Sequence, residues 1–288
     1  MSAKILDGKK RAEEIKESIK KELSSIKAAY EETPKLVALQ VKEDAAFSVY
    51  TNAQKKVAEA IGIDYELITL SDESSESELI ENIESLNNDN TVSGIMVQSP
   101  LPENFDFIKV TSSISPLKDV EGLHPEHKGK LLLHAYNIIP PTAASVMELI
   151  RLSGVELHGK EAVVIGHSRI VGKPIAMLLL DKLATVTIAH IATSERGNLE
   201  EHIKRAEVLV TAVGKPSLVK GELIKDGAIV IDAGISRVDG KIVGDVEFEE
   251  ANKRASYITP VPGGVGPLTT AVLMHNCFKL FREQRAKK

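Results

Sequence analysis

Tyr50 and Gln54 are the first residues along the chain whose types and spacing suggest shared chemistry. They stand four positions apart in VYTNAQKKVAEAIGI, so a helix here places both on one face, with Lys55 and Lys56 pointing elsewhere. A tyrosine ring can stack on a flat ligand, whereas an amide exchanges hydrogen bonds but carries no proton at neutral pH. Without further context, a half-buried helix tyrosine and a solvated glutamine are the better interpretation.

A second group of residues suited to binding is the glycine loop in VVIGHSRIVGKP. Gly166 follows an apolar strand and Gly172 stands at the start of the next helix, where N–H groups and the helix dipole can meet a pyrophosphate. The spacing is not G-x-G-x-x-G, so the loop alone is equally consistent with a structural turn. Further glycines in GAIVIDAG and ITPVPGGVGP follow later strands, at the edge where open α/β sheets bind ligands.

The end of the next strand bears on the choice of dinucleotide. An Asp or Glu about 20 residues after the first glycine usually holds the free 2′-hydroxyl of NAD. Here the segment AHIATSERG offers His190, Thr193 and Ser194, with no carboxylate before Glu195. The sequence therefore favours NADP and leaves NAD open. Candidate partners for the 2′-phosphate are Arg169, Arg196 and His167.

Apolar runs of strand length alternate with helix-type periodicity along the whole chain. This alternation predicts an α/β protein with parallel sheets and right-handed crossovers, and 288 residues suffice for two domains. Residues 1–139 are expected to form an αβα substrate domain, and residues 140–266 a Rossmann-type doubly wound domain beginning at the double proline. The last helix, 267–288, has an apolar stripe that could pack back on the first domain.

Composition excludes several classes of function. A net charge of −5 gives no general attraction to nucleic acid or acidic membranes, and no apolar run is long enough to span a bilayer. The amino terminus lacks the pattern of a secretory signal. A lone cysteine, Cys277, favours a reducing compartment such as the cytoplasm. His124 and His127 lie three apart but have no evident third ligand, so we expect a loop surface and no metal.

Taken together, the motifs resemble those of the methylenetetrahydrofolate dehydrogenase/cyclohydrolase (FolD-like) family. The similarity runs nearly end to end, through VYTNAQKKVAEAIGI, VQSPLP, SPLKDVEGL, GHSRIVGKP, ATVTIAH, GAIVIDAGI, VGDVEF and TPVPGGVGPLTTAVLM. The resemblance implies a folate domain, a Rossmann-type NAD(P) domain, a cleft between them and usually a homodimer. A shikimate-type or amino-acid-type dehydrogenase shares the two-domain layout but would not be expected to carry both VQSPLP and PGGVGPLTT.

The resemblance also implies roles for individual residues. Tyr50 matches the tyrosine that stacks on folate and Gln98 matches the active-site glutamine, so the candidate catalytic residues are Tyr50, Gln54, Gln98 and Glu121. The folate-binding candidates are Tyr50, Gln98, Pro100, Leu101, Glu121, Gly263, Gly264 and Pro267. The cofactor-binding candidates are Thr142, Gly166, His167, Ser168, Arg169, Ile170, Gly172, His190, Thr193, Ala212, Val213, Gly234, Ile235, Gly266 and Thr270.

Several positions depart from the family pattern. The family's active-site lysine stands where this chain has Gln54, and neither Lys55 nor Lys56 is in that register. Glu121 replaces the second aspartate of the KDVDG motif, and His167 replaces the arginine of the GRS loop. Two further changes are Val41-Lys42 in place of the VG pair and Pro140-Pro141-Thr142-Ala143 in place of PCTP.

These departures bear on the two reactions that the resemblance implies. Oxidation of 5,10-methylenetetrahydrofolate by hydride transfer needs positioning and no protein acid or base. Hydrolysis of the methenyl product needs a titrating group, which an amide cannot supply. The sequence therefore predicts a dehydrogenase with weak or absent cyclohydrolase activity, served by a separate downstream cyclohydrolase. Two alternatives stay open: a fully bifunctional enzyme in which another group replaces the lysine, and a catalytically impaired folate-binding or regulatory protein.

Overall fold

The computed structural model describes residues 2–30, 32–42 and 45–286, with backbone alone for residues 27–30 and 45–50. Contacts divide the chain into two compact units. The six-stranded unit combines the chain through Ala12 with Pro140–Thr269. The three-stranded unit combines Glu13–Ile139 with the chain from Thr270 onward.

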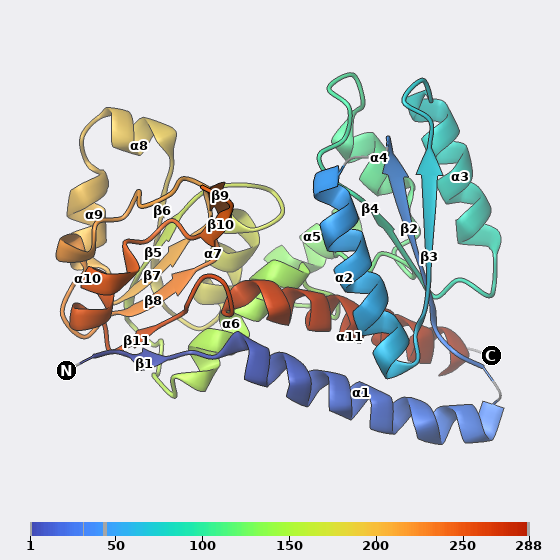
Figure 1. The fold of residues 1–288 in the computed structure, drawn as a ribbon, viewed down its shortest axis with the longest axis horizontal. Helices are drawn as coiled ribbons and strands as arrows, with labels where there is room; N and C mark the ends of the chain where they lie inside the picture. The colour runs from blue at the N-terminus through green and yellow to red at the C-terminus, as the bar shows by residue number, and fades with distance from the viewer. Residues whose placement is uncertain (1, 31, 43–44, 287–288) are drawn as a thin grey trace. The chain divides into compact units, whose positions relative to one another are not determined.

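The three-stranded unit is built on a parallel sheet in the order β3-β2-β4 (Figure 1). Its strands are β2 (Lys35–Val41), β3 (Asp64–Leu70) and β4 (Gly94–Val97). Beyond β4, an isolated parallel bridge joins Ile95 to Asp119, and the Ile95 N–H donates to the Lys118 carbonyl at 2.7 Å. The segment around Asp119 therefore runs along the open edge of β4.

Helices cover both faces of this sheet, which is the predicted αβα arrangement. Because successive side chains of a strand point to opposite faces, Leu36 and Ala38 of β2 pack in one core cluster, and Val37 and Leu39 in another. Three helices contribute to the first cluster: α1 (Gly8–Tyr30), α2 (Ala45–Ile61) and α11 (Val265–Ala286). The second cluster involves α3 (Glu76–Asn88) and α4 (Phe107–Ser113), and α5 (Pro125–Leu132) follows.

The six-stranded unit is a parallel sheet in the order β1-β11-β8-β7-β5-β6. From β5 the chain passes to β6 on one side and then to β7, β8 and β11 on the other, so the strand order reverses between β5 and β7. This confirms the predicted doubly wound sheet, which binds ligands at such a reversal. The strands are β1 (Lys4–Ile5), β5 (Glu161–Ile165), β6 (Thr185–Ala189), β7 (Val208–Thr211), β8 (Ile229–Asp232) and β11 (Tyr257–Ile258).

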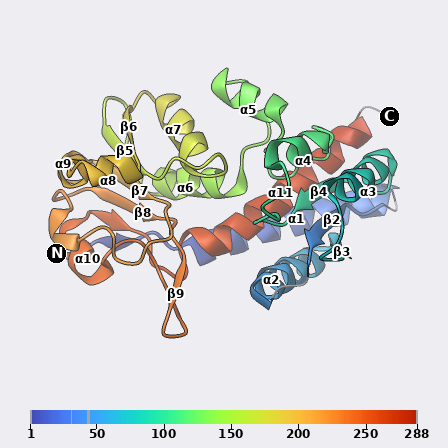
Figure 2. The same cartoon turned by 90° about the horizontal axis from the view of Figure 1, so that it is seen from above.

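Five helices and a hairpin complete this unit. α9 (Leu199–Arg205) and α10 (Phe248–Arg254) share one core cluster with alternate residues of β5, β7 and β8. α6 (Pro141–Leu152) and α7 (Gly172–Leu180) pack together, and the short α8 (Ile191–Glu195) follows β6. A short 3₁₀ turn spans Gly221–Leu223. The hairpin of β9 (Ser236–Val238) and β10 (Lys241–Val243) extends away from the sheet in Figure 2.

The start of the chain lies elsewhere than the sequence suggests. Residues 1–12 were expected in the first domain, but β1 pairs with β11, and the Leu6 N–H donates to the Ile258 carbonyl at 2.8 Å. A side chain at Gly8 would fall 1.8 Å from the Gly264 carbonyl oxygen, so α1 begins directly against the PGGVGP loop. A two-residue strand leaves no periodic pattern in a sequence, which explains the difference.

Helix α11 is anchored inside the three-stranded unit by a buried amide. Asn276 is 5% exposed, and its Nδ2 donates to the carbonyl oxygens of Val120 at 2.8 Å and Ile139 at 3.0 Å. Phe278 and Phe281 of the same helix are buried in the core. The Asn276 amide therefore ties α11 to the segment that carries Glu121 and to Ile139, the last residue before the chain passes into the six-stranded unit.

We expect Asn276→Ala to reduce the free energy of unfolding by about 1–3 kcal/mol, because two buried carbonyls would lose their donor. Urea unfolding followed by circular dichroism measures the change. The matched control is Arg282→Ala on the same helix, which removes an exposed ion pair with Glu22 and should cost less than about 1 kcal/mol. Equal losses in the two variants would contradict the anchoring role.

Candidate functional site

A neutral hydrogen-bonded cluster surrounds Gln54. Its Oε1 accepts from the Tyr65 hydroxyl at 3.0 Å and from Gln98 Nε2 at 3.1 Å. Gln98 directly follows β4, where its N–H donates to the Leu39 carbonyl at 2.8 Å and its side chain is buried. The Gln54 carbonyl oxygen already accepts two hydrogen bonds. The part of this side chain that can bind a ligand is therefore its amino group, as a donor.

Tyr65, on β3, belongs to this cluster, although no sequence motif pointed to it. Burial raises the pKa of its hydroxyl to about 12, so Tyr65 remains a hydrogen-bond donor at neutral pH. It stands eleven residues after Gln54, at the start of the next strand, and no motif connects the two. The contact arises because the helix–strand turn returns the chain alongside α2.

Tyr50, the predicted folate-stacking residue, lies in α2 one turn before Gln54. Its side chain is outside the described part of the structure. Lys55 and Lys56 are both exposed, as predicted, and Lys55 lies 3.9 Å from Glu59. Both lysine side chains therefore lie on a solvent-facing side of α2.

Lys42, which the resemblance to the family marked as a departure, stands at a position with a demanding backbone. Its φ is +74°, in the left-handed region that glycine adopts most easily. Its Nζ lies 3.0 Å from Asp72 Oδ2, and its N–H donates to the Leu70 carbonyl. The loop after β2 thus keeps a glycine-like backbone with a lysine in place.

Glu121 lies at the open edge of β4, near the end of the strand. Its carboxylate accepts the N–H of Val97, the residue before Gln98. Burial, and secondarily the charge of Asp119, raise the pKa of Glu121 to about 8. Asp119 is itself buried and accepts the N–H groups of Glu121 at 3.1 Å and His124 at 2.8 Å.

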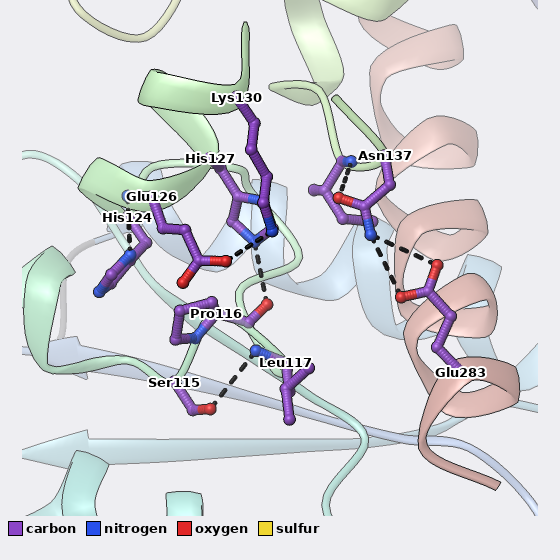
Figure 3. Close-up of polar contacts among 10 residues, drawn as sticks. Ser115, Pro116, Leu117, His124, Glu126, His127, Lys130, Asn137 and Glu283 are labelled. Atoms are coloured by element: carbon purple, nitrogen blue, oxygen red, sulfur yellow. Dashed lines mark hydrogen bonds and ion pairs between the residues drawn. The ribbon is translucent and has the colours of Figure 1, made fainter. Parts of the chain in front are cut away.

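Helix α5 and its hydrogen bonds correct the prediction for the two histidines (Figure 3). His127 is buried, with Nε2 2.9 Å from the Pro116 carbonyl oxygen, so it does not lie on a loop surface. His124 caps the start of α5, where its Nδ1 accepts the Glu126 N–H at 3.0 Å. A proline at the first helical position made a loop look more plausible than the helix that it begins.

The residues that follow Gln98 in the VQSPLP segment differ in their exposure to solvent. The Ser99–Pro100 peptide bond is cis, and Pro100 is exposed. Leu101 is partly buried and packs against the core cluster of β4, α3 and α4. Of these two predicted folate contacts, Pro100 is therefore the more accessible.

The glycine loop of the six-stranded unit is closed by very short backbone approaches. A Cβ at Gly172 would lie 2.1 Å from the Gly166 carbonyl oxygen, and one at Gly166 would lie 2.6 Å from the Ala212 carbonyl oxygen. Ser168 Oγ accepts the N–H groups of Val171 at 3.1 Å and Gly172 at 3.4 Å. The turn therefore packs the backbone of the glycine loop closely against the start of α7. This place lies at the reversal of strand order, where a pyrophosphate can bind.

Polar and basic side chains flank this loop. The rings of His167 and His190 lie 5.1 Å apart between centroids, and both residues are exposed. The Thr193 hydroxyl accepts the His190 N–H at 3.2 Å. Arg169 is exposed on the same loop, whereas Ile170 is half-buried. The structure thus brings His167, a predicted partner of the 2′-phosphate, next to His190, a predicted cofactor residue, at the ends of β5 and β6.

Two buried aspartates hold the neighbouring loops, and the sequence did not single them out. Asp245 accepts the N–H groups of Val213 at 2.8 Å and Lys215 at 2.7 Å. Asp232 accepts those of Gly234 and Val246, each at 2.9 Å. Their signal was an aspartate inside the apolar segments IVIDAG and VGDVEF. They fix the loops that carry the exposed Val213 and Ile235.

The PGGVGP loop is mainly packed against the start of α1. Gly263 and Gly264 are buried, and the Lys9 N–H donates to the Gly263 carbonyl at 3.2 Å. Gly266 and Pro267 are half-buried. The remaining predicted cofactor residues are Thr142 in the first turn of α6, Ala212 after β7 and Thr270 in α11, all half-buried.

Comparison with known proteins shows the family of this chain. Residues 6–121 match the model of the tetrahydrofolate dehydrogenase/cyclohydrolase catalytic domain, and residues 140–285 match that family's NAD(P)-binding domain. The chain belongs to this family of enzymes. A bifunctional protein FolD from Acetivibrio thermocellus is 48% identical to this family member over 289 residues, covering 100% of both chains.

Solved structures of the family superpose closely on this FolD-like chain. A bifunctional FolD from Campylobacter jejuni has a TM-score of 0.94 and 39% identity, covering 98% of this chain and 99% of its own. FolD from Trypanosoma brucei, complexed with NADP and an inhibitor, has a TM-score of 0.93 and 37% identity, covering 98% of each. Shikimate dehydrogenase from Thermus thermophilus, with 14% identity and a TM-score of 0.51, shares the fold alone.

Two further features of the described residues concern membranes and metals. No helix within residues 2–30, 32–42 and 45–286 is long and apolar enough to cross a membrane. In the same part of the chain, no three His, Cys, Asp or Glu side chains gather in a way that could hold a metal ion.

We expect Gly172→Ala to weaken dinucleotide binding at least about tenfold, since a methyl group would force the turn away from the Gly166 carbonyl. Fluorescence titration of reduced NADP measures the dissociation constant. The control is Gly227→Ala, whose φ of +81° makes it a strained substitution in open space, distant in sequence from the loop. Similar dissociation constants for wild type and Gly172→Ala would contradict the role of this turn.

Proposed function

We propose that this enzyme oxidises 5,10-methylenetetrahydrofolate to the 5,10-methenyl cation and transfers the hydride to NADP. The folate would bind at the cluster of Gln54, Gln98 and Glu121, and the dinucleotide at the glycine loop. Family membership and the intact backbone of that loop support this proposal. The observation that carries its finer part is the neutral cluster at the position where the family has a lysine.

Hydride transfer makes modest demands on these side chains. The substrate nitrogen lone pair drives hydride loss from the bridging carbon, and NADP accepts it. The protein must hold the donor carbon in attack geometry and exclude water. Gln98 and the amino group of Gln54 can orient the pterin. The Tyr65 hydroxyl and Gln98 Nε2 both donate to Gln54 Oε1, which fixes the orientation of the Gln54 amide.

Hydrolysis of the methenyl product makes a different demand. Water must lose a proton as it adds to the bridging carbon, and N5 must gain one as its bond to that carbon breaks. Gln54 exchanges no proton at neutral pH, and removal of general acid–base help typically costs about 10²–10⁴-fold in rate. Methenyltetrahydrofolate should therefore accumulate during turnover. A separate cyclohydrolase would then be needed to consume it.

Full bifunctionality is the second candidate. The observation in its favour is the 48% identical relative, which bears the name of a bifunctional protein. In that case another titrating group would have to perform the work of the missing lysine. An impaired folate binder has less support, because both halves retain an organised site.

We also propose a homodimer in the cytoplasm as the working form. β3 is an edge strand of seven residues with several exposed positions, which leaves backbone groups available for pairing with a second copy. The single cysteine is buried, and burial raises the pKa of its thiol to about 12, in keeping with a structural residue in a reducing compartment.

The substitution Gln54→Lys tests the main proposal. Wild-type enzyme with methylenetetrahydrofolate and NADP should accumulate methenyl absorbance, whereas the lysine variant should hydrolyse methenyltetrahydrofolate at least about tenfold faster. Gln54→Met, which introduces no titrating group, is the matched control and should gain no hydrolysis. Wild-type hydrolysis as rapid as methenyl formation would refute the proposed weakness, and absence of cofactor reduction would refute the dehydrogenase itself.

The choice of NADP is tested at His167. We expect His167→Ala to raise the dissociation constant for NADP about three- to tenfold more than that for NAD, because one hydrogen bond to a charged group is lost. Fluorescence titration with both reduced cofactors measures the difference. His158→Ala changes an exposed histidine outside the glycine loop and should alter neither value. Equal effects on NADP and NAD would place the 2′-phosphate elsewhere.

A further inference from the structure

Two buried aspartates of the six-stranded unit do not enter the reaction as described. Asp232 is 3% exposed and Asp245 is fully buried. Burial of a carboxylate is costly unless hydrogen bonds satisfy it. Both carboxylates accept backbone N–H groups, and both lie where the loops after β7, β8 and β10 meet. This costly arrangement therefore holds three loops at one place.

Asp245 gathers three consecutive N–H groups of the loop after β7. Its Oδ2 accepts from Val213 at 2.8 Å and Gly214 at 3.3 Å, and its Oδ1 accepts from Lys215 at 2.7 Å. Gly214 has a φ of +66°, which glycine adopts readily and which lets neighbouring N–H groups converge on one anion. The Ser236 hydroxyl, at the end of the loop after β8, donates to the Gly214 carbonyl at 3.0 Å. The carboxylate therefore sets the path of one loop, and the hydroxyl joins it to the next.

Asp232, the last residue of β8, holds the two other loops. Its Oδ1 accepts the Gly234 N–H at 2.9 Å and the Thr211 hydroxyl at 3.0 Å. Its Oδ2 accepts the Val246 N–H at 2.9 Å. One carboxylate thus links the end of β7, the loop after β8 and the loop after β10.

Each aspartate fills the space that a glycine beside the other aspartate leaves open. A Cβ at Gly234 would lie 2.1 Å from the carboxyl carbon of Asp245, and a Cβ at Gly244 would lie 2.0 Å from Asp232 Oδ2. Gly244 directly precedes Asp245, and Gly234 follows Asp232 by two residues. The loops after β8 and β10 therefore interlock. We call these four residues the aspartate brace.

The aspartate brace lies on the side of the glycine loop away from β6. A Cβ at Gly166 would lie 2.6 Å from the Ala212 carbonyl oxygen and 3.4 Å from Val213 Cγ1, so the loop after β7 packs on the glycine loop. In doubly wound sheets the adenosine ribose lies at the end of the strand that follows the glycine loop, here β6. β7 and β8 lie on the other side of β5 (Figure 1). The nicotinamide half of a dinucleotide would therefore meet the braced loops.

We propose that Asp232 and Asp245 are positioning residues that preorganise the nicotinamide half of the cofactor site. They act through the loops that carry the side chains of Val213 and Ile235, which are 41% and 44% exposed, and not by touching the cofactor. Exposed apolar side chains hold a flat ring in one place only while their backbone stays fixed. This inference rests on the proposed NADP site and adds what shapes one half of it.

Dissection of the cofactor tests the proposal. Isothermal titration of the full-length enzyme with NADP and with 2′,5′-ADP, which lacks the nicotinamide half, gives two dissociation constants for each variant. Asp245→Asn places an amino group against backbone N–H groups, so the loop after β7 loses its fixed path. It should bind NADP at least about tenfold more weakly, and 2′,5′-ADP within about twofold of wild type. Asp232→Asn should show the same selectivity. At saturating NADP, kcat should fall in both variants because the nicotinamide is misplaced.

Three further variants separate positioning from stability. Asp226→Asn removes an exposed carboxylate that pairs with Arg254 in the same unit, and it should change neither constant. Gly172→Ala alters the turn of the glycine loop and should weaken both ligands. Val213→Ala shortens an exposed side chain, so it should fold even if the aspartate variants do not. It should weaken NADP about threefold and leave 2′,5′-ADP unchanged.

The pattern of losses decides the outcome. Equal weakening of NADP and 2′,5′-ADP by Asp245→Asn, or no weakening of either, would show a purely structural role and overturn the inference alone. An unchanged NADP constant in Val213→Ala would also overturn it. Wild-type enzyme that binds neither ligand would overturn the proposed NADP site itself.

Discussion

Parallel strand pairing is the constraint on which the rest of this structure depends. A parallel strand can join its neighbour only through a crossover, so the loops that leave the carboxyl ends of the strands collect at one edge of each sheet. In the three-stranded unit this edge carries Gln98 and, along the open side of β4, Glu121. In the six-stranded unit it carries the glycine loop, His190 and the loops after β7 and β8. Residues far apart in sequence become neighbours for this reason alone.

Desolvation then decides what these neighbours can do. Gln54, Tyr65 and Gln98 are neutral groups that satisfy one another, so their burial costs little and leaves an organised surface without a proton to exchange. Glu121 and Lys128 are ionisable groups in a similar environment, and burial drives both of their pKa values toward neutrality. The same unit thus holds a neutral cluster around Gln54 and, elsewhere, ionisable groups whose pKa values are shifted by burial.

Backbone geometry limits which residues each loop can carry. The six-stranded unit keeps glycines where a Cβ would meet backbone at 2.1–2.6 Å, and it braces the adjoining loops with the buried carboxylates of Asp232 and Asp245. The three-stranded unit tolerates Lys42 at a positive φ, where a side chain points to solvent and meets only a modest strain. Substitution is therefore accommodated where space remains and excluded where backbone meets backbone.

The sequence by itself determined the α/β class, the doubly wound sheet, the family and the position of the glycine loop. These follow from local features: apolar runs of strand length, helix periodicity and short contiguous motifs. The resemblance also predicts that Gln54 stands where the family has its lysine, because register within one helix is a local property. Only the tertiary structure placed β1 in the six-stranded sheet, Tyr65 against Gln54 and His127 in the interior. Each of these depends on a turn that brings separate elements together, and the burial that raises the pKa of Glu121 exists only once those elements have packed.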